Sequence, residues 1–190
     1  PDFARKIHVE ASRMIQLVND ILQLSNLDNV SEAGTPLTME TVDLLEVARE
    51  CVERQKVNAK RSFISLTYLG ESAPVLGSRS LLDELCQNLC DNAIRYNRPG
   101  GKVQIITACT RDGHCSLTVK DNGIGIPKEA QSSVFERFYR VDKSRSKATG
   151  GTGLGLAIVK HIARIHNARI KLESEIGEGT TITVLFETAH

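Results

Sequence analysis

The sequence predicts an α+β domain preceded by one long helix. Apolar residues recur at helical spacing in some segments and alternate at strand spacing in others, and a hairpin turn joins two of the strands. We therefore expect three helices on a mixed, mostly antiparallel sheet. Of the 190 residues, 41% are apolar, which is enough for a core, and only 4% are aromatic, so that core must be aliphatic.

Composition excludes several classes of protein. Lys and Arg total 24 against 23 Asp and Glu, and a net charge of +1 argues against a large basic face for nucleic acid. No apolar run approaches the roughly 20 residues of a membrane helix, and we expect no signal peptide. The chain starts with proline rather than methionine, so we expect a piece of a longer protein.

The five cysteines are odd in number and include no C-x-x-C pair. A disulfide framework or zinc ribbon is therefore not expected, and free thiols fit a reducing cytoplasm. Cys86 and Cys90 lie four residues apart on a predicted helix. They could share a metal as thiolates, but no nearby histidine completes a ligand set, so we interpret them as small buried hydrophobes.

Residues 1–28 are predicted to form a helix with a heptad-like apolar seam. The seam steps by four and three residues through Ile7, Ala11, Met14, Val18, Ile21 and Ser25. One helix cannot bury such a stripe alone, so its partner helices must come from another chain or from a segment outside this sequence. Residues 29–36 carry turn and linker residues, so we place a domain boundary there, with the second domain over residues 37–190.

The elements of the second domain follow from periodicity and from start and stop signals. Strands are predicted over residues 37–42, 64–69, 74–76, 102–110, 115–120, 168–174 and 180–186. Helices are predicted from Asp43, as an N-cap with Glu46 in a capping box, to about Lys60; from Ser78 or Ser80 to about Tyr96; and over 154–167. Residues 121–153 show little periodicity, and such stretches in compact domains are usually functional.

The helix that ends near Tyr96 carries polar residues along one face. Glu84, Asn88, Asn92 and Tyr96 are spaced by four, with Arg95 beside the last. Asparagine inside a helix costs propensity, and its side-chain oxygen is a hard donor of the kind that Mg²⁺ accepts alongside water and substrate phosphates. The alternative is an ordinary solvated helix face.

Residues 121–127 follow a predicted strand and combine an acidic residue with two glycines. Gly123 and Gly125 let the chain turn sharply and approach a ligand closely. Asp121 is an acceptor suited to an exocyclic amino group, as on adenine, and Ile126 helps to form an apolar wall. A plain Asx turn is the alternative.

Residues 150–156 form a glycine-rich run that leads into a helix. Backbone N–H groups and the helix dipole converge at such a place and favour an anion. The spacing matches neither a Walker loop nor the dinucleotide fingerprint. A flexible linker of this composition is the alternative reading.

These motifs together resemble the ATP-binding domain of sensor histidine kinases, in the superfamily that includes gyrase, heat-shock ATPase chaperones and mismatch-repair ATPases. In order, the resemblance covers an N box at 84–96, a first glycine box at 121–126, an F box at 135–140, a second glycine box at 151–156 and a closing glycine turn at 177–180. The F box marks histidine kinases within the superfamily. The resemblance implies a two-layer α/β sandwich of the Bergerat type, and residues 1–28 resemble the second helix of a dimerization and phosphotransfer domain.

The resemblance also implies roles for individual residues. Asp121 would bind the adenine amino group with Thr180 in support, Asn88 would ligate Mg²⁺, and Glu84 would be the base or water-positioning acid. Arg95 replaces the lysine of many members, which keeps the charge but changes the donor geometry, and would act in catalysis. The remaining ATP-binding residues would be Asn92, Tyr96, Gly123, Gly125, Ile126, Arg137, Gly151, Thr152, Gly153, Leu154, Gly155 and Leu156. Residues 137–150, with Lys143, Arg145 and Lys147, would form a mobile lid anchored by Phe135 and Phe138.

The implied reaction is phosphoryl transfer from Mg-ATP to a histidine, for onward transfer to an aspartate of a response regulator. None of the five histidines fits the acceptor pattern, so we expect this chain to bind ATP without phosphorylating itself. His161 and His166 are interpreted as caps near a helix C-terminus. We further expect a homodimer through the N-terminal helix of a membrane-anchored bacterial parent, a cytoplasmic location, and no contact of this part with membrane or nucleic acid. The alternatives are an ATPase of the chaperone or repair branch and a non-enzymatic nucleotide-binding dimerization module.

Overall fold

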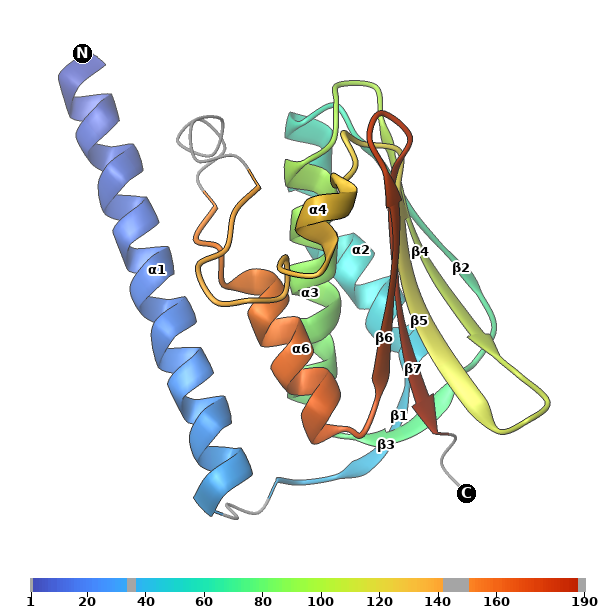
Figure 1. Ribbon diagram of the computed structural model, residues 1–190. Coiled ribbons are helices and arrows are strands. Elements are labelled where there is room, and N and C mark those ends of the chain that lie inside the picture. Colours follow the sequence, from blue (N-terminus) through green and yellow to red (C-terminus); the bar gives the residue numbers. More distant parts are fainter. Residues whose placement is uncertain (1, 34–36, 142–150, 188–190) are drawn as a thin grey trace.

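The computed structural model describes residues 2–33, 37–141 and 151–187. Three helices form one layer and a five-stranded sheet forms the other, while a fourth, long helix lies beside the helical layer (Figure 1). The layer contains α2 (Leu44–Arg61), α3 (Arg79–Arg95) and α6 (Gly155–Ile165), and the long helix is α1 (Asp2–Ala33). This arrangement confirms the predicted α+β sandwich.

The sheet is mixed, as predicted. Its strand order is β2 (Ser65–Gly70), β4 (Lys102–Cys109), β5 (His114–Asp121), β7 (Gly179–Glu187) and β6 (Arg169–Glu175). Only the β2–β4 pair of this sheet is parallel. The short strands β1 (Glu40–Asp43) and β3 (Pro74–Gly77) pair separately, and a one-turn helix, α4 (Lys128–Gln131), lies in the stretch without predicted periodicity.

The core lies between the sheet and the helical layer. Strand alternation turns Ile105 and Leu117 toward the helices, where both are fully buried with Leu85 and Ile158. The core is aliphatic except for Phe186, as the composition predicts. A hydrogen bond also connects α6 with α3. His166, which follows α6, accepts through Nε2 from the N–H of Ser78 at the start of α3, at 3.0 Å.

The start of α2 confirms one capping prediction and corrects another. The Asp43 carboxylate accepts from the Leu45 N–H at 2.9 Å, and from the Ala73 N–H and the Ser72 hydroxyl. Burial raises the pKa of Asp43, but these hydrogen bonds outweigh it and lower the pKa. The capping box is wrong, because the Glu46 carboxylate pairs with Arg49 on the next turn.

The N-terminal helix is longer than predicted. It continues to Ala33, so residues 29–33, which we assigned to a linker, are helical. The physical reason is that the first strong helix breaker after the seam is Gly34. The seam residues are exposed on α1, whereas Leu24 and Leu27 on another face are buried beside α6. The seam is therefore left uncovered by the other elements among the described residues. No helix of the described chain is long and apolar enough to span a membrane.

Two cysteines correct the expectation of free thiols. Cys109 and Cys115 lie opposite each other in the β4–β5 pair, with Cα atoms 4.1 Å apart, and form a disulfide. Strand register brings these residues together, which cysteine spacing alone does not reveal. Cys51, Cys86 and Cys90 are free and buried, which confirms the interpretation of the α3 pair.

Candidate functional site

The predicted polar face of α3 lies against the N-terminus of α6. A methyl group at Gly155 would lie 3.0 Å from Oδ1 of Asn88 and 3.4 Å from Nδ2 of Asn92. A methyl group at Gly151 would lie 3.0 Å from Nη1 of Arg95 and 3.1 Å from the Tyr96 hydroxyl. The second glycine box therefore packs directly on the N box. Gly151 and Gly155 lack side chains that would crowd the side chains of the N box.

Asp121 forms the centre of a second cluster at the end of β5. Its Oδ1 accepts from the Gly123 N–H at 2.8 Å and from the Thr180 N–H at 3.3 Å, since Thr180 is its register partner on β7. Burial raises the pKa of Asp121, and the two backbone hydrogen bonds oppose that rise. The Thr180 hydroxyl lies 2.9 Å from that of Ser174. Asp121 is thus a half-buried acceptor held by two backbone N–H groups, and its bond to Gly123 closes the Asx turn given above as the alternative.

The first glycine box joins the two clusters. A methyl group at Gly123 would lie 2.5 Å from the carbonyl oxygen of Tyr96, which also accepts from the Ile124 N–H at 3.1 Å. At Gly125 (φ +71°) a methyl group would lie 1.9 Å from the Glu175 carbonyl oxygen. The half-buried Ile126 donates its N–H to Ser174. The structure therefore brings all three predicted motifs together at the C-terminal end of α3.

Glu84 lies on the same face of α3, one turn before Asn88. Burial raises the pKa of Glu84 to about 7, a hydrogen bond with Gln23 of α1 opposes that rise, and the Asp20 charge adds to it. Its Oε1 is buried and has no hydrogen-bond partner among residues 2–33, 37–141 and 151–187. A carboxyl group that titrates near neutrality, with one oxygen unused, is suited to proton transfer.

The α1 helix contacts this site, which the sequence did not predict. Asp20 is only 7% exposed and accepts from the Thr152 hydroxyl of the second glycine box at 2.6 Å. Arg137 donates to both oxygens of Asp28, at 2.8 and 2.9 Å. His161, interpreted above as a cap, lies within 3.0 Å of the Leu27 carbonyl oxygen instead. One feature of the sequence points to this contact: Asp20 lies on the face of α1 away from the apolar seam.

The remaining residues of the second glycine box have structural roles. Leu154 is fully buried in the core, so its side chain cannot contact a ligand, and Leu156 packs against that core. Gly153 (φ +76°) accepts from the Phe138 N–H at 2.9 Å through its carbonyl oxygen, which ties the F box to this segment. Of the predicted lid, residues 142–150, which include Lys143, Arg145 and Lys147, lie outside the described residues.

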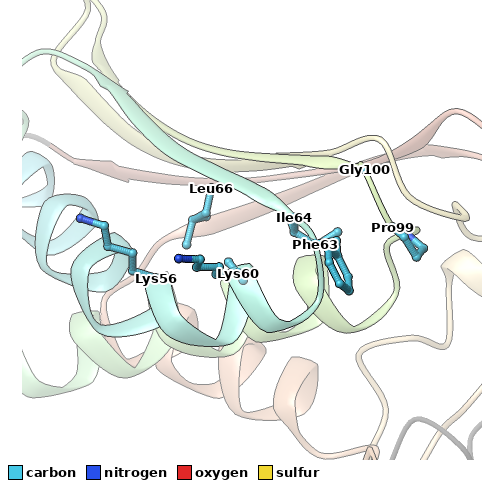
Figure 2. Close-up of a pocket in the computed structure, with 8 residues that line it drawn as sticks. Lys56, Lys60, Phe63, Ile64, Leu66, Pro99 and Gly100 are labelled. Carbon is cyan, nitrogen blue, oxygen red and sulfur yellow. The ribbon is translucent and has the colours of Figure 1, made fainter.

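Neither a cavity nor a cluster of metal ligands indicates a different site. A surface groove of about 720 Å³ lies between the end of α2, β2 and the turn at Pro99 and Gly100 (Figure 2). Phe63 and two lysines line it, but it contains none of the predicted site residues. In the described part of the chain, no group of three or more His, Cys, Asp or Glu side chains could hold a metal ion. Convergence of the motifs therefore locates the candidate site better than cavity size does.

A family model described as "Histidine kinase-, DNA gyrase B-, and HSP90-like ATPase" matches residues 77–190. The chain belongs to this family of ATPases. The sensor-like histidine kinase SenX3 of Mycolicibacterium smegmatis is 44% identical to this chain over 186 residues, which are 96% of this chain and 47% of SenX3. The chain thus spans about half the length of that curated relative.

Solved structures show the same fold. The mycobacterial sensor histidine kinase MprB matches with a TM-score of 0.68 and 32% identity, over 79% of this chain and 97% of the MprB chain. Full-length ShkA in complex with AMPPNP matches with a TM-score of 0.79 and 25% identity, over 95% of this chain and 37% of the ShkA chain. A match over 95% of this chain must include part of α1.

Proposed function

We propose that this chain is the catalytic, ATP-binding part of a two-component sensor histidine kinase. It binds Mg-ATP and presents the γ-phosphate to a histidine outside this sequence. The observation that carries the proposal is the contact of the Asn88 and Asn92 face with the glycines at the start of α6. The names of SenX3 and MprB support the kinase assignment.

The two clusters divide the recognition of ATP between them. Asp121 accepts a hydrogen bond from the adenine amino group, because two backbone N–H groups fix its carboxylate and burial strengthens the contact. The phosphates bind at the start of α6, where backbone N–H groups and the helix dipole favour negative charge. Arg95 adds a cation beside Gly151.

The residues at this site fit a magnesium ion held jointly with the phosphates. Asn88 donates its Nδ2 to the Glu84 carbonyl oxygen at 3.1 Å, which directs Oδ1 toward Gly155. A single amide ligand suffices, since Mg²⁺ keeps several waters and binds phosphate oxygens. When bound, the ion neutralises charge that develops on the phosphates. Glu84 then holds or accepts a proton at Oε1, the oxygen without a partner in the described residues.

The parent protein supplies the rest of the reaction. We infer that its acceptor histidine lies on another helix, that the α1 seam pairs in a homodimer, and that a response-regulator aspartate receives the phosphate. In this scheme residues 37–190 are the ATP-binding domain and α1 belongs to a dimerization and phosphotransfer domain in the cytoplasm. Pairing of the exposed seam would bury its apolar side chains, which is the physical reason for expecting a dimer.

The role of Asn88 is tested by the Mg²⁺ dependence of ATP binding, measured by calorimetry. Wild type is expected to bind ATP more tightly with Mg²⁺ than with EDTA. In Asn88→Ala the ratio of these two affinities should be about tenfold smaller, a change of about 1.4 kcal/mol. Asn58→Ala, an exposed asparagine on α2, is the matched control and should behave as wild type. Equal Mg²⁺ dependence in Asn88→Ala and wild type would remove Asn88 from the metal site.

A further inference from the structure

The groove between α2 and β2 lies apart from the proposed nucleotide site. Figure 2 shows the helix and the strand diverging from the turn at Phe63, with Leu66 on the strand side. Ala59 and Ile64 line the groove and are buried, whereas Leu66 is half-buried. Its volume of about 720 Å³ is in the range of protein ligand sites. The groove therefore offers an apolar surface with room for a partner's side chains.

Phe63 has a backbone conformation that rarely suits phenylalanine. It follows the C-cap of α2 with a φ of +57°, at a position where helices usually carry glycine. Its carbonyl oxygen accepts from the Gly100 N–H at 2.8 Å, which fixes the turn. The ring is 75% exposed, the largest fraction for a large apolar side chain in the described chain. Burial within this chain does not offset the strain, which favours a contact of the ring with a partner.

The strand beside the groove is an open edge of the sheet (Figure 1). Among the described residues β2 pairs with β4 alone. Ser65 and Glu71, at the two ends of this pairing, donate their N–H groups to carbonyl oxygens on the β4 side, at 2.9 and 3.3 Å. Because successive N–H groups of a strand point in opposite directions, those of Leu66, Tyr68 and Gly70 point away from β4. The β2 edge can therefore pair with one more strand.

The two edge strands of the sheet differ in their protection against such pairing. β6 has an exposed charged residue at every second position, namely Arg169, Lys171, Glu173 and Glu175. Charged side chains on an edge strand hinder pairing with another chain. β2 has no charged residue over Ser65–Gly70. The β2 edge thus lacks the protection of the opposite edge, which favours a role in binding.

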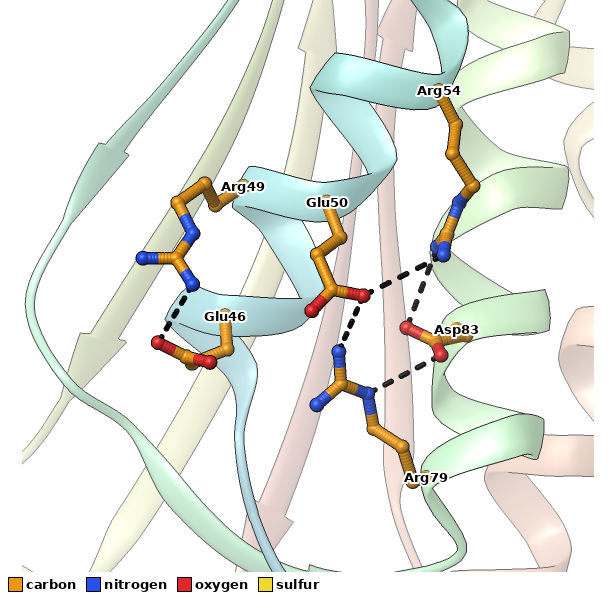
Figure 3. Close-up of polar contacts among 6 residues, drawn as sticks. All are labelled: Glu46, Arg49, Glu50, Arg54, Arg79 and Asp83. Carbon is orange, nitrogen blue, oxygen red and sulfur yellow. Dashed lines mark hydrogen bonds and ion pairs between the residues drawn. The ribbon is translucent and has the colours of Figure 1, made fainter.

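The basic residues in the first half of α2 are paired within the fold (Figure 3). Arg49 pairs with Glu46 at 3.0 Å. Arg54 pairs with Glu50 at 3.6 Å and with Asp83 of α3 at 3.4 Å. The chain itself therefore neutralises the positive charges in this half of the helix.

The second half of α2 has an excess of positive charge beside the groove. Residues 56–70 include Lys56, Lys60 and Arg61 and no acidic residue. Lys56 pairs with Glu53 at 3.5 Å, and both side chains are exposed. In residues 2–33, 37–141 and 151–187, no ion pair involves Lys60 or Arg61. The two lysines that line the groove therefore favour an acidic partner.

We propose that the groove and the β2 edge bind an acidic, extended segment of a partner protein. The segment adds a strand beside β2 and hydrogen-bonds with the outward backbone groups of Leu66 and Tyr68. Its alternate side chains face the groove, where an apolar one packs on Phe63 and Leu66. Acidic side chains on either side of it pair with Lys56 and Lys60. A second copy of this chain fits poorly, because its residues 56–70 bring the same positive charges.

NMR titration of the isotope-labelled chain with the peptide acetyl-Thr-Glu-Thr-Leu-Thr-Glu-Thr-amide tests the site. In this peptide Glu, Leu and Glu share one face of an extended strand. The amide signals of Leu66, Tyr68 and Gly70 should shift until saturation, whereas those of β6 should stay unchanged. A control peptide with Lys in place of both Glu should bind at least about tenfold more weakly, because its charges repel the two lysines.

Phe63→Gly separates a binding role of the ring from a structural one. Glycine suits the left-handed backbone, so the variant should keep or raise the urea midpoint of wild type. It should nevertheless bind the peptide at least about tenfold more weakly, because the apolar contact is lost. The double variant Lys56→Glu with Lys60→Glu should weaken binding to a similar extent. Lys171→Glu on β6, the matched control, should bind as wild type.

Four results would overturn the proposal. They are the absence of shifts along β2 at millimolar peptide, equal binding by Phe63→Gly and wild type, self-association that Phe63→Gly abolishes, and displacement of the peptide by phosphatidylglycerol vesicles. The third would assign the edge to a second copy of the chain, and the fourth would assign the groove to a lipid surface. None of these measurements involves ATP, so failure of the proposed nucleotide site would leave their outcome unchanged.

Discussion

Several glycines of the candidate site lie where a side chain has no space. Gly125 combines a φ of +71° with a carbonyl oxygen 1.9 Å from the position of a methyl group, whereas Gly100 (φ +81°) has nothing within 4 Å of that position. The two positions share a left-handed backbone and differ in crowding. They therefore separate backbone strain from steric overlap.

Gly125→Ala is expected to lower the free energy of unfolding by about 2–4 kcal/mol, because strain and overlap add. Gly100→Ala, the control, should lower it by only about 1–2 kcal/mol, the strain alone. Urea denaturation followed by circular dichroism measures both. Equal losses for the two variants would show that the first glycine box is not crowded against β6.

The raised pKa of Glu84 should make the free energy of unfolding depend on pH. Its folded pKa, about 7, lies above the value of 4.5 for an unperturbed glutamate, so the ionised form destabilises the fold at high pH. Glu84→Gln should be more stable than wild type at pH 8. That advantage should shrink as the pH falls through 7 toward 4.5, where wild type is protonated too. Urea midpoints at pH 8 and pH 5 measure it, and an advantage independent of pH would contradict the buried position of Glu84.

Polar contacts in the C-terminal half of α1 hold this helix against the ATP-binding domain. The ion pair of Asp28 with Arg137 is the most exposed of them, and the hydrogen bond of Asp20 with Thr152 is the most buried. Arg137 and Thr152 also belong to the predicted ATP-binding set. The helix therefore contacts two of the residues for which ATP binding is proposed.

Asp28→Asn should loosen this contact. The loss of an ion pair at a partly exposed position costs about 1 kcal/mol, so amide exchange in residues 20–28 and 137–141 should become about fivefold faster. Hydrogen exchange with mass spectrometry measures the change. Glu10→Gln removes an exposed pair with Arg13 within α1 and should leave exchange in both segments unchanged. Unaltered exchange in Asp28→Asn would mean that this pair does not hold α1 in place.

Elements with strong local signals could be predicted from the sequence, whereas contacts made by tertiary packing could not. The α3 polar face and its end at Tyr96 follow from spacing by four and from the Pro-Gly-Gly stop. Residues 29–33 are helical although their polar side chains are typical of a linker, because none of these residues breaks a helix. The Cys109–Cys115 pair and the contact of Asp20 with Thr152 depend on strand register and helix docking, which no local pattern encodes.

The sheet and the helical layer together bring motifs that are far apart in the chain to one end of the molecule. β5 and β7 place Asp121 beside Thr180, and the packing of α3 on α6 places Asn88 beside Gly155. The first glycine box connects these two places through Tyr96. The central proposal is that this end of the helical layer binds ATP, with Asp121 as the adenine acceptor, Asn88 as a magnesium ligand and the N-terminus of α6 as the phosphate site.

Calorimetry of Mg-ATP binding to the chain, with Asp121→Asn as the variant, tests that proposal most directly. Wild type and the exposed control Asp112→Asn should bind with the same affinity. Asp121→Asn should bind at least about tenfold more weakly, because an amide donor would face the adenine amino group, itself a donor. Equal affinity of Asp121→Asn and wild type, or no binding by wild type, would contradict the account.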